Sequence, residues 1–303
     1  MAIKHFIDVD QLSLKELKEI FIRAKYFCTK PQNELLKGKK LINLFFENST
    51  RTRSAFEISA KNMGAEVINI DISTSALKKG ESEKDTIYTL NAMSPDFLTI
   101  RHVESGIVEK LARYSESATV INSGDGAHAH PTQALLDCYT IFEKLKFNSL
   151  EEFKKLKIVI CGDIINSRVA RSNIKLLNML GAKINLVGPA PLVPHSFADE
   201  NIKIFYDIEA AVKDADVIMT LRIQQERMKS CLISSLRDYY RNYGIKRELL
   251  KNAKKSCFIL HPGPINRNVE LESELADDKD VCLVLNQVQN GIAVRQALLE
   301  FLI

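Results

Sequence analysis

Short apolar runs alternate with longer amphipathic stretches along most of the chain, and this alternation constrains the fold more than any other feature of the sequence. Each run has the length and composition of a strand, and each intervening stretch has the spacing of a helix with one buried face. Parallel strands are joined by crossovers of this kind, which are right-handed. A chain of 303 residues also exceeds one typical core. We therefore predict an α/β protein of two doubly wound domains with mostly parallel sheets, and an active site in the cleft between them, at the carboxyl ends of the strands.

The apolar periodicity places the individual elements. A capping box at Ser13 and Glu16 predicts a first helix, on which Leu14, Leu17, Phe21 and Ala24 share one face. Further helices are expected at 50–63, 85–93, 106–114, 131–142 and 168–180, and an amphipathic helix closes the chain. Strands are expected at 41–44, 66–71, 96–101, 118–122, 157–161, 184–187, 202–205, 217–221 and 257–260.

Composition and charge exclude several classes of protein. The chain is 46% hydrophobic and 26% charged, which is ordinary for a soluble globular enzyme. Its 42 basic and 38 acidic residues give a net charge of +4, too small to argue for nucleic acid or a membrane surface as partner. We expect neither a signal peptide nor a membrane-spanning segment. The six cysteines are scattered without a C-x-x-C pair, so we expect buried thiols in a reduced, cytoplasmic protein.

The segment from Phe45 to Arg53 is a candidate anion site. It follows an apolar run and precedes an amphipathic one, so Ser49 falls at the N-cap of a helix. Three hydroxyls and two arginines lie within five residues here, beside the positive end of a helix dipole. Such a group of donors can hold a phosphate. An ordinary capped helix with two surface arginines is the alternative, and the density of donors favours the anion site.

Several other cationic or donor side chains also follow predicted strands. Together with Arg51 they are Lys79, Arg101, His130, Gln133, Arg168 and Arg222. The carboxyl ends of neighbouring parallel strands meet at one edge of a sheet, so these side chains are expected to gather there. Each arginine alone is equally consistent with a solvated surface charge. Their shared position after strands favours two small polyanionic substrates.

A dinucleotide site after the strand at 157–161 is one alternative, because Gly162 follows that strand. The dinucleotide fingerprint requires three glycines, which allow the backbone to approach a pyrophosphate. Asn166 and Ser167 stand where glycines are required, which disfavours this interpretation.

A metal site and a hydrolase nucleophile are two further alternatives. His128 and His130 beside Asp125 resemble a fragment of a metal site, but no third or fourth ligand is evident, so we expect no metal. Ser49 lacks the G-x-S-x-G elbow that a hydrolase nucleophile requires.

Motifs that cover nearly the whole chain resemble, in their order, those of the aspartate and ornithine carbamoyltransferase family. They are Ser49-Thr50-Arg51-Thr52-Arg53, Ser75-x-x-x-Lys79-Gly80, His130-Pro131-Thr132-Gln133, Gly162-Asp163 with Arg168, Arg222-x-Gln224 and His261-Pro262-Gly263-Pro264. The ornithine branch is similar in the first half, but it typically carries His-Pro-Cys-Gln and His-Cys-Leu-Pro segments, which differ from those here. Ornithine would also require an acidic pocket, whereas Arg168, Arg222 and Lys79 suit a second carboxylate.

The resemblance implies transfer of the carbamoyl group from carbamoyl phosphate to the amine of L-aspartate, a step of pyrimidine synthesis, without a metal or organic cofactor. Residues implied to bind carbamoyl phosphate are Ser49, Thr50, Arg51, Thr52, Arg101, His130, Gln133, Pro262, Gly263 and Pro264, of which Arg51, Thr52, Arg101 and His130 are implied to be catalytic. Residues implied to bind aspartate are Lys79, Arg168, Arg222 and Gln224. Two alternatives stay open: another amine acceptor such as ornithine, or a non-catalytic binder of phosphorylated metabolites.

The resemblance also implies a division into domains and an assembly. A carbamoyl-phosphate-binding domain would span 1–135, with the C-terminal helix 286–303 packing back on it, and an aspartate-binding domain would span 136–285. The implied assembly is a homotrimer with shared active sites, in which Ser75 and Lys79 reach the neighbouring subunit. Regulatory chains or a dihydroorotase are partners that the sequence neither requires nor excludes. A tight turn at Gly263–Pro264 implies a cis peptide bond there.

Overall fold

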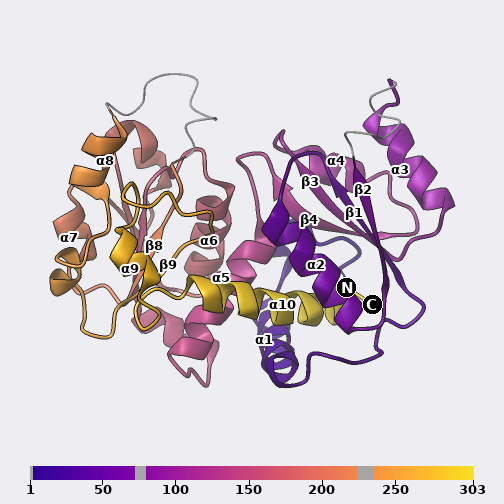
Figure 1. Ribbon diagram of the computed structural model, residues 1–303, viewed down its shortest axis with the longest axis horizontal. Coiled ribbons are helices and arrows are strands. Elements are labelled where there is room, and N and C mark those ends of the chain that lie inside the picture. The colour runs from indigo at the N-terminus through magenta and orange to yellow at the C-terminus, as the bar shows by residue number, and fades with distance from the viewer. Residues whose placement is uncertain (1–2, 72–79, 224–234) are drawn as a thin grey trace. The chain divides into compact units, whose positions relative to one another are not determined.

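The computed structural model of the chain describes residues 3–71, 80–223 and 235–303. The chain divides into two compact units, Met1–Tyr139 with Val288–Ile303, and Thr140–Gln287. Each unit is built on one sheet in which all paired neighbouring strands are parallel (Figure 1). The predicted fold of two doubly wound α/β domains is therefore confirmed.

The first unit contains a four-stranded sheet in the order β2-β1-β3-β4. Its strands are β1 (Lys40–Phe45), β2 (Glu66–Asp71), β3 (Phe97–His102) and β4 (Thr119–Asp125). A 3-10 turn at Val9–Gln11 precedes helices α1 (Leu14–Thr29), α2 (Thr50–Asn62), α3 (Glu83–Ala92) and α4 (Ile107–Ala112). Two helices run on from one unit into the other, α5 (Pro131–Lys144) and α10 (Val284–Phe301).

Helices cover both faces of this sheet, because the chain reverses direction across it. The first crossover leads from β1 to β2 on one side, and the later ones lead back to β3 and on to β4. Right-handed crossovers in opposite directions place α2 on one face and α3 and α4 on the other. The apolar core on the α3 and α4 side comprises Ile42, Leu44, Ile87, Leu90, Leu98, Ile100, Val108, Leu111, Ala112, Ala118 and Val120.

The second unit contains a five-stranded sheet in the order β7-β6-β5-β8-β9. Its strands are β5 (Lys157–Cys161), β6 (Lys183–Val187), β7 (Ile202–Phe205), β8 (Val217–Thr220) and β9 (Phe258–Leu260). Its helices are α6 (Arg168–Met179), α7 (Ile208–Val212), α8 (Leu236–Tyr243) and α9 (Ser273–Asp277), with 3-10 turns at Leu150–Lys155, Ala190–Leu192, His195–Phe197 and Leu249–Asn252. Figure 1 shows α6 and α7 on opposite sides of this sheet.

Both faces of β5 are buried, as expected for a parallel sheet covered by helices. Val159 and Cys161 join a core that includes Ala211 and Val212 of α7. The alternate residues Ile158 and Ile160 therefore point to the opposite face, and they are buried as well. No helix within 3–71, 80–223 and 235–303 is long and apolar enough to cross a membrane.

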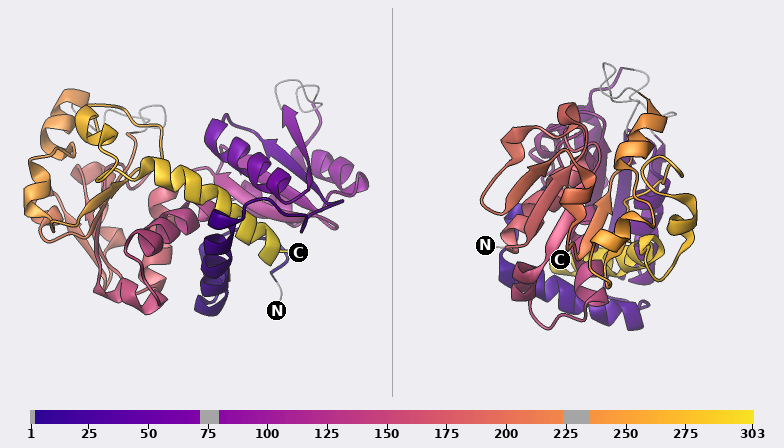
Figure 2. Two further views of the ribbon diagram at one scale, coloured as in Figure 1. Left: turned by 60° about the horizontal axis from the view of Figure 1, so that its bottom comes forward. Right: turned by 90° about the vertical axis from the view of Figure 1, so that its left-hand side faces the viewer.

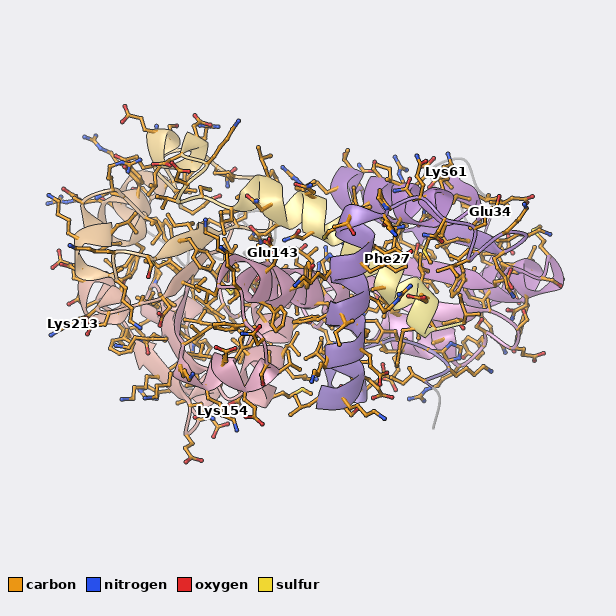
Figure 3. All side chains as sticks on the ribbon, turned by 90° about the horizontal axis from the view of Figure 1, so that it is seen from below. Phe27, Glu34, Lys61, Glu143, Lys154 and Lys213 are labelled. Atoms are coloured by element: carbon orange, nitrogen blue, oxygen red, sulfur yellow. The ribbon has the colours of Figure 1, made fainter. Side chains whose placement is uncertain are left out.

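Helix α1 packs against α10, as Figures 2 and 3 show from two directions. Arg23 Nε on α1 lies 2.6 Å from Glu300 Oε2 on α10. Phe27, which is marked on α1 in Figure 3, is buried in the first unit. Ser59 Oγ of α2 also donates to the carbonyl of Ile292, so α10 is held from two sides.

Every predicted strand is present, and the largest difference is at β4, which continues to Asp125. Two predictions of burial were wrong. Leu14 is 51% exposed, because the stripe of α1 that packs begins one turn later, at Leu17. Cys28 is exposed beside the buried Phe27, whereas Cys138, Cys161, Cys257 and Cys282 are buried. None of these described thiols forms a disulfide.

Candidate active site

The carboxyl edge of the first sheet brings two of the predicted segments together. Strands β1 and β3 are neighbours, with Phe45 paired to Arg101. The N–H of Phe46 donates to the carbonyl of Arg101 over 2.8 Å. The chain leaves these two strands in opposite directions, which makes this point a topological switch, where doubly wound folds bind ligands. The segment that starts at Phe46 and the side chain of Arg101 thus begin from adjacent positions.

The N-terminus of α2 lies at this switch point and is left open. Ser49 is the N-cap residue, as predicted, but its side chain makes no capping hydrogen bond. Within the described residues, no acceptor takes the N–H groups of Thr50, Arg51 and Thr52. The serines that begin α1, α3, α6 and α8 do cap their helices, through the hydroxyls of Ser13, Ser82, Ser167 and Ser235. Uncapped N–H groups at the positive end of a 13-residue helix can bind an anion.

Arg51 and Thr52 differ in their surroundings. The Arg51 side chain is exposed and pairs with no carboxylate of the described chain. Thr52 is only 6% exposed, so its side chain is largely desolvated. One exposed cation and one buried hydroxyl-bearing side chain therefore stand on the first turn of the same helix.

Arg101 is held in place by two oxygen atoms. Its Nε lies 2.6 Å from Oε1 of Glu47, and its Nη1 donates to the carbonyl of Ser123 over 3.2 Å. Glu47 belongs to the loop between β1 and α2, so this ion pair joins the two segments of the switch point. Glu47 was not predicted as a site residue, although it lies within the candidate anion segment.

The turn after β4 is organised by Asp125. Its carboxylate is 1% exposed and accepts from the N–H of Gly106 over 2.9 and 3.0 Å. His128 Nδ1 lies 3.0 Å from the same carboxylate. Asp125 and His128 thus serve the turn, and within the described parts of the chain no three His, Cys, Asp or Glu side chains gather as a metal site would require.

His130 and Gln133 follow at the start of α5. The His130 side chain is 5% exposed, and its carbonyl accepts from the N–H of Gln133 and of Ala134. Gln133 Nε2 donates to Asp137 Oδ1 over 2.8 Å, one turn along the helix. These residues follow β4, which pairs with β3, the strand that carries Arg101.

The carboxyl edge of the second sheet gathers another three segments. Strands β5, β8 and β9 are adjacent, and the N–H of Leu221 donates to the carbonyl of Cys161 over 2.8 Å. Arg168 is the first residue of α6 and is 6% exposed. Arg222 follows β8 and is half-buried. These two arginines thus follow neighbouring strands at the switch point of this sheet.

The loop after β5 closes without the glycines of a dinucleotide site. Asp163 is completely buried and accepts from both the N–H and the side-chain amide of Asn166. Gly162 has φ of +131°, and a Cβ there would lie 3.1 Å from Leu221 atoms. This glycine therefore allows close packing of β5 on β8.

The predicted loop after β9 lies at the same edge. The Gly263–Pro264 bond is cis, which confirms the prediction. The residue before the loop, His261, is buried and accepts through Nδ1 from the N–H of Gly263 over 2.8 Å. Pro262 and Gly263 are half-buried, and Pro264 is exposed.

Three predicted residues, Ser75, Lys79 and Gln224, lie outside the described residues. The remaining ones fall into two groups. The edge of the first sheet carries Ser49, Thr50, Arg51, Thr52, Arg101, His130 and Gln133, and the edge of the second carries Arg168, Arg222, Pro262, Gly263 and Pro264.

Two family models match the chain in succession. Residues 4–143 match the aspartate/ornithine carbamoyltransferase carbamoyl-P binding domain, and residues 154–302 match the Asp/Orn binding domain of the same family. The chain belongs to the aspartate/ornithine carbamoyltransferase family. The resemblance inferred from the motifs is thereby confirmed.

Close relatives within the carbamoyltransferase family are catalytic subunits of aspartate carbamoyltransferase. That of Rhodospirillum rubrum is 45% identical over 302 residues, which cover 100% of this chain and 92% of the relative. That of Pelagibacter ubique is also 45% identical and covers 98% of this chain and 95% of its own length.

Solved structures of the family agree with the fold. Aspartate transcarbamoylase from Trypanosoma cruzi with carbamoyl aspartate and phosphate is 27% identical, covers 99% of this chain and 95% of its own, and has a TM-score of 0.87. The same enzyme with N-(phosphonacetyl)-L-aspartic acid is also 27% identical over the same shares of the two chains and gives a TM-score of 0.88.

Glu47 and Asp137 contact predicted site residues at the carboxyl edge of the first sheet, but the sequence motifs did not predict them. Glu47 carries no signal beyond its place beside the arginines, because its partner Arg101 comes from another strand. Asp137 could have been found, since it lies four residues after Gln133 on one helix face.

Proposed function

We propose that this chain transfers the carbamoyl group of carbamoyl phosphate to the amine of L-aspartate. The products are N-carbamoyl-L-aspartate and phosphate, in the biosynthesis of pyrimidines. The observation that carries this proposal is the N-terminus of α2, which has no side-chain cap and lies beside Arg101 at the switch point of the first sheet. Arg51 on its first turn pairs with no carboxylate of the described residues. It is supported by relatives that carry the name aspartate carbamoyltransferase catalytic subunit and match this chain over 92% and 95% of their own length.

The phosphate would bind at the start of α2. Its oxygens would accept from backbone N–H groups, from the hydroxyls of Ser49, Thr50 and Thr52, and from the guanidinium of Arg51. These groups would also neutralise the phosphate as it leaves. Arg51 and the helix dipole would offset the negative charge of the leaving phosphate, which can take the proton of the attacking amine.

The carbamoyl carbonyl would be polarised by three donors. As the amine attacks, negative charge grows on the carbonyl oxygen, and Thr52, Arg101 and His130 would stabilise it. Arg101 suits this role, because Glu47 and Ser123 hold its guanidinium in one position. The carbamoyl NH₂ would donate to Gln133 and to the carbonyls of Pro262 and Gly263, with Pro264 shaping that turn. No covalent intermediate is needed when both reactants are held in line.

The two carboxylates of aspartate would bind Arg168 and Arg222, helped by Lys79 and Gln224. A planar guanidinium binds a carboxylate through two parallel hydrogen bonds, which suits a dicarboxylate. Ornithine brings a cation in place of the second carboxylate and would be repelled by these arginines.

The test is an assay with labelled carbamoyl phosphate and a panel of amines that includes aspartate, ornithine and glutamate. We expect label in carbamoyl aspartate alone. Label transferred to another amine would reassign the acceptor, and binding of carbamoyl phosphate without any transfer would favour a binding protein.

The proposal extends to the assembly. We propose a homotrimer in which Ser75 and Lys79 of one subunit complete the site of its neighbour, since head-to-tail contacts can close as a three-fold ring. A cytoplasmic location is part of the same proposal and rests on the scattered cysteines. Sedimentation at micromolar concentration would distinguish the trimer from a monomer or from a larger complex.

A further inference from the structure

Gln133 and Asp137 form a hydrogen-bonded pair inside the first unit. They lie one turn apart on α5, with Gln133 Nε2 2.8 Å from Asp137 Oδ1. Asp137 is completely buried, and Gln133 is 9% exposed. The contact is thus protected from water. In such a buried place a hydrogen bond is strong, and two donors or two acceptors that face each other cost free energy.

The chemistry of the two groups determines which end of the glutamine amide faces Asp137. An ionised carboxylate only accepts hydrogen bonds, so the nitrogen of the amide must face it. The oxygen, Gln133 Oε1, is then directed away from Asp137, and no residue of the described chain donates to it. Asp137 therefore engages the nitrogen end of the Gln133 amide and leaves Oε1 available to accept a hydrogen bond.

A buried cation interacts electrostatically with Asp137. Arg295 of α10 is 3% exposed, donates through Nη1 to the carbonyl of Gly291 over 2.7 Å, and lies 5.1 Å from the ring centre of Phe56. Burial lowers the pKa of Arg295 to about 10, and the charge of Asp137 opposes that shift. Arg295 thus remains protonated at neutral pH, and the carboxyl of Asp137 is its electrostatic partner inside the first unit.

We propose that Asp137 is a positioning residue that orients Gln133 so that its Oε1 accepts from the NH₂ of the carbamoyl group, which selects carbamoyl phosphate over acyl phosphates without an N–H. This inference rests on the proposed function, which places Gln133 against the carbamoyl amide. Acetyl phosphate is the matched competitor, because it replaces NH₂ by CH₃ at nearly the same volume. A methyl group would leave Oε1 without a donor, and a site built to hydrogen-bond an N–H rejects such an analogue.

The first variant is Asp137→Asn, which keeps the shape but can donate as well as accept. The amide of Gln133 is then free to turn over and present its NH₂ to the ligand. We expect the dissociation constant of carbamoyl phosphate, measured by calorimetry without aspartate, to rise about tenfold. The dissociation constants of acetyl phosphate and inorganic phosphate should stay within about threefold of their wild-type values, because neither ligand has an N–H to donate to Oε1.

A second variant restores the polarity of the pair. Gln133→Glu alone places two carboxylates against each other and should weaken carbamoyl phosphate binding further. Combined with Asp137→Asn, it gives a carboxylate that accepts from the new amide and still presents an oxygen to the ligand. The double variant should recover most of the preference for carbamoyl over acetyl phosphate, which a merely structural role of Asp137 would not predict.

Three outcomes would overturn the inference. The first is an equal loss of affinity for carbamoyl phosphate and acetyl phosphate in Asp137→Asn. The second is an unchanged preference of that variant for carbamoyl phosphate. The third is a double variant whose preference for carbamoyl phosphate is no higher than that of either single variant. If Asp137→Asn does not fold, as thermal unfolding would show, the double variant retains the hydrogen bond and decides by its preference alone. Absence of transfer to any amine by the wild type would refute the proposed function, while the binding comparison would still test Asp137.

Discussion

His261 Nε2 lies 3.2 Å from Glu270 Oε1, and both side chains are completely buried. His261 Nδ1 accepts from the N–H of Gly263, so the ring proton is on Nε2 and is donated to Glu270. The same carboxylate oxygen accepts from the N–H of Asn266 over 2.6 Å. Glu270 thus holds both ends of the loop that carries Pro262 and Gly263.

Substituting Glu270 by alanine should destabilise the chain strongly. The change removes the acceptor of the Nε2–H of the buried His261 and that of the N–H of the half-buried Asn266. Losing each hydrogen bond should lower the free energy of unfolding by about 1–3 kcal/mol. Glu270→Gln keeps an acceptor oxygen at the same place and should cost less than half as much. Urea unfolding of both variants measures the difference. An alanine variant as stable as the glutamine variant would show that the carboxylate does not hold the loop.

Arg51 should be essential for turnover and dispensable for folding. Arg51→Ala would remove the proposed charge-assisted contact to the leaving phosphate, and we expect turnover to fall by about 10²-fold or more. Arg113→Ala is the matched control, because its side chain is 74% exposed and its partner among the described residues is Glu109 on α4. Steady-state kinetics at saturating substrates decides. Near-normal turnover in the Arg51 variant would remove the start of α2 from the site.

Arg222 should distinguish the two substrates. Arg222→Ala would remove the proposed two-pronged contact to a carboxylate of aspartate, so the Michaelis constant for aspartate should rise by about 10- to 100-fold. The affinity for carbamoyl phosphate without aspartate should change little. Arg222→Lys keeps the charge but loses the planar guanidinium that makes two parallel hydrogen bonds. Its Michaelis constant for aspartate should therefore lie between those of the wild type and Arg222→Ala. A selective loss of carbamoyl phosphate binding would instead place Arg222 on the first substrate.

Buried thiols should weaken the fold in alkali. Burial raises the pKa of Cys161 and that of Cys257 to about 12 each, from a usual value of 9.0. Both thiols stay protonated in the folded chain above pH 9, while the unfolded chain loses those protons. Their contribution is therefore complete below about pH 9 and is lost as the pH rises towards 12, by about 1.4 kcal/mol per pH unit for each thiol.

The comparison of variants isolates this effect from other alkaline transitions. The free energy of unfolding of Cys161→Ala/Cys257→Ala should fall less steeply between pH 9.5 and 11 than that of the wild type, by about 2–3 kcal/mol per pH unit. Cys28→Ala is the control, because that side chain is exposed. Parallel slopes for the wild type and the double variant would contradict the assignment.

The sequence was sufficient for the strands and for the start of α2, because both depend on local patterns. An apolar run such as that of β5 ends where polar residues begin, and Ser49 precedes a helical period. Distant pairs were not predictable: no local pattern connects Glu47 with Arg101, which lies on another strand. Periodicity also shows which face of a helix packs but not how far the packed surface extends, so the burial of Leu14 was predicted wrongly.

The shared site of the proposed trimer can be tested by mixing two nearly inactive variants, Arg51→Ala and Lys79→Ala, unfolded and reassembled together in equal amounts. If Lys79 serves the neighbouring subunit, an intact site combines the Arg51 of a Lys79→Ala chain with the Lys79 of a neighbouring Arg51→Ala chain. Random assembly gives that pair with a chance of one half times one half, so roughly a quarter of wild-type activity should return. If Lys79 serves its own chain, every site keeps one lesion, and mixing restores nothing above the sum of the separate variants.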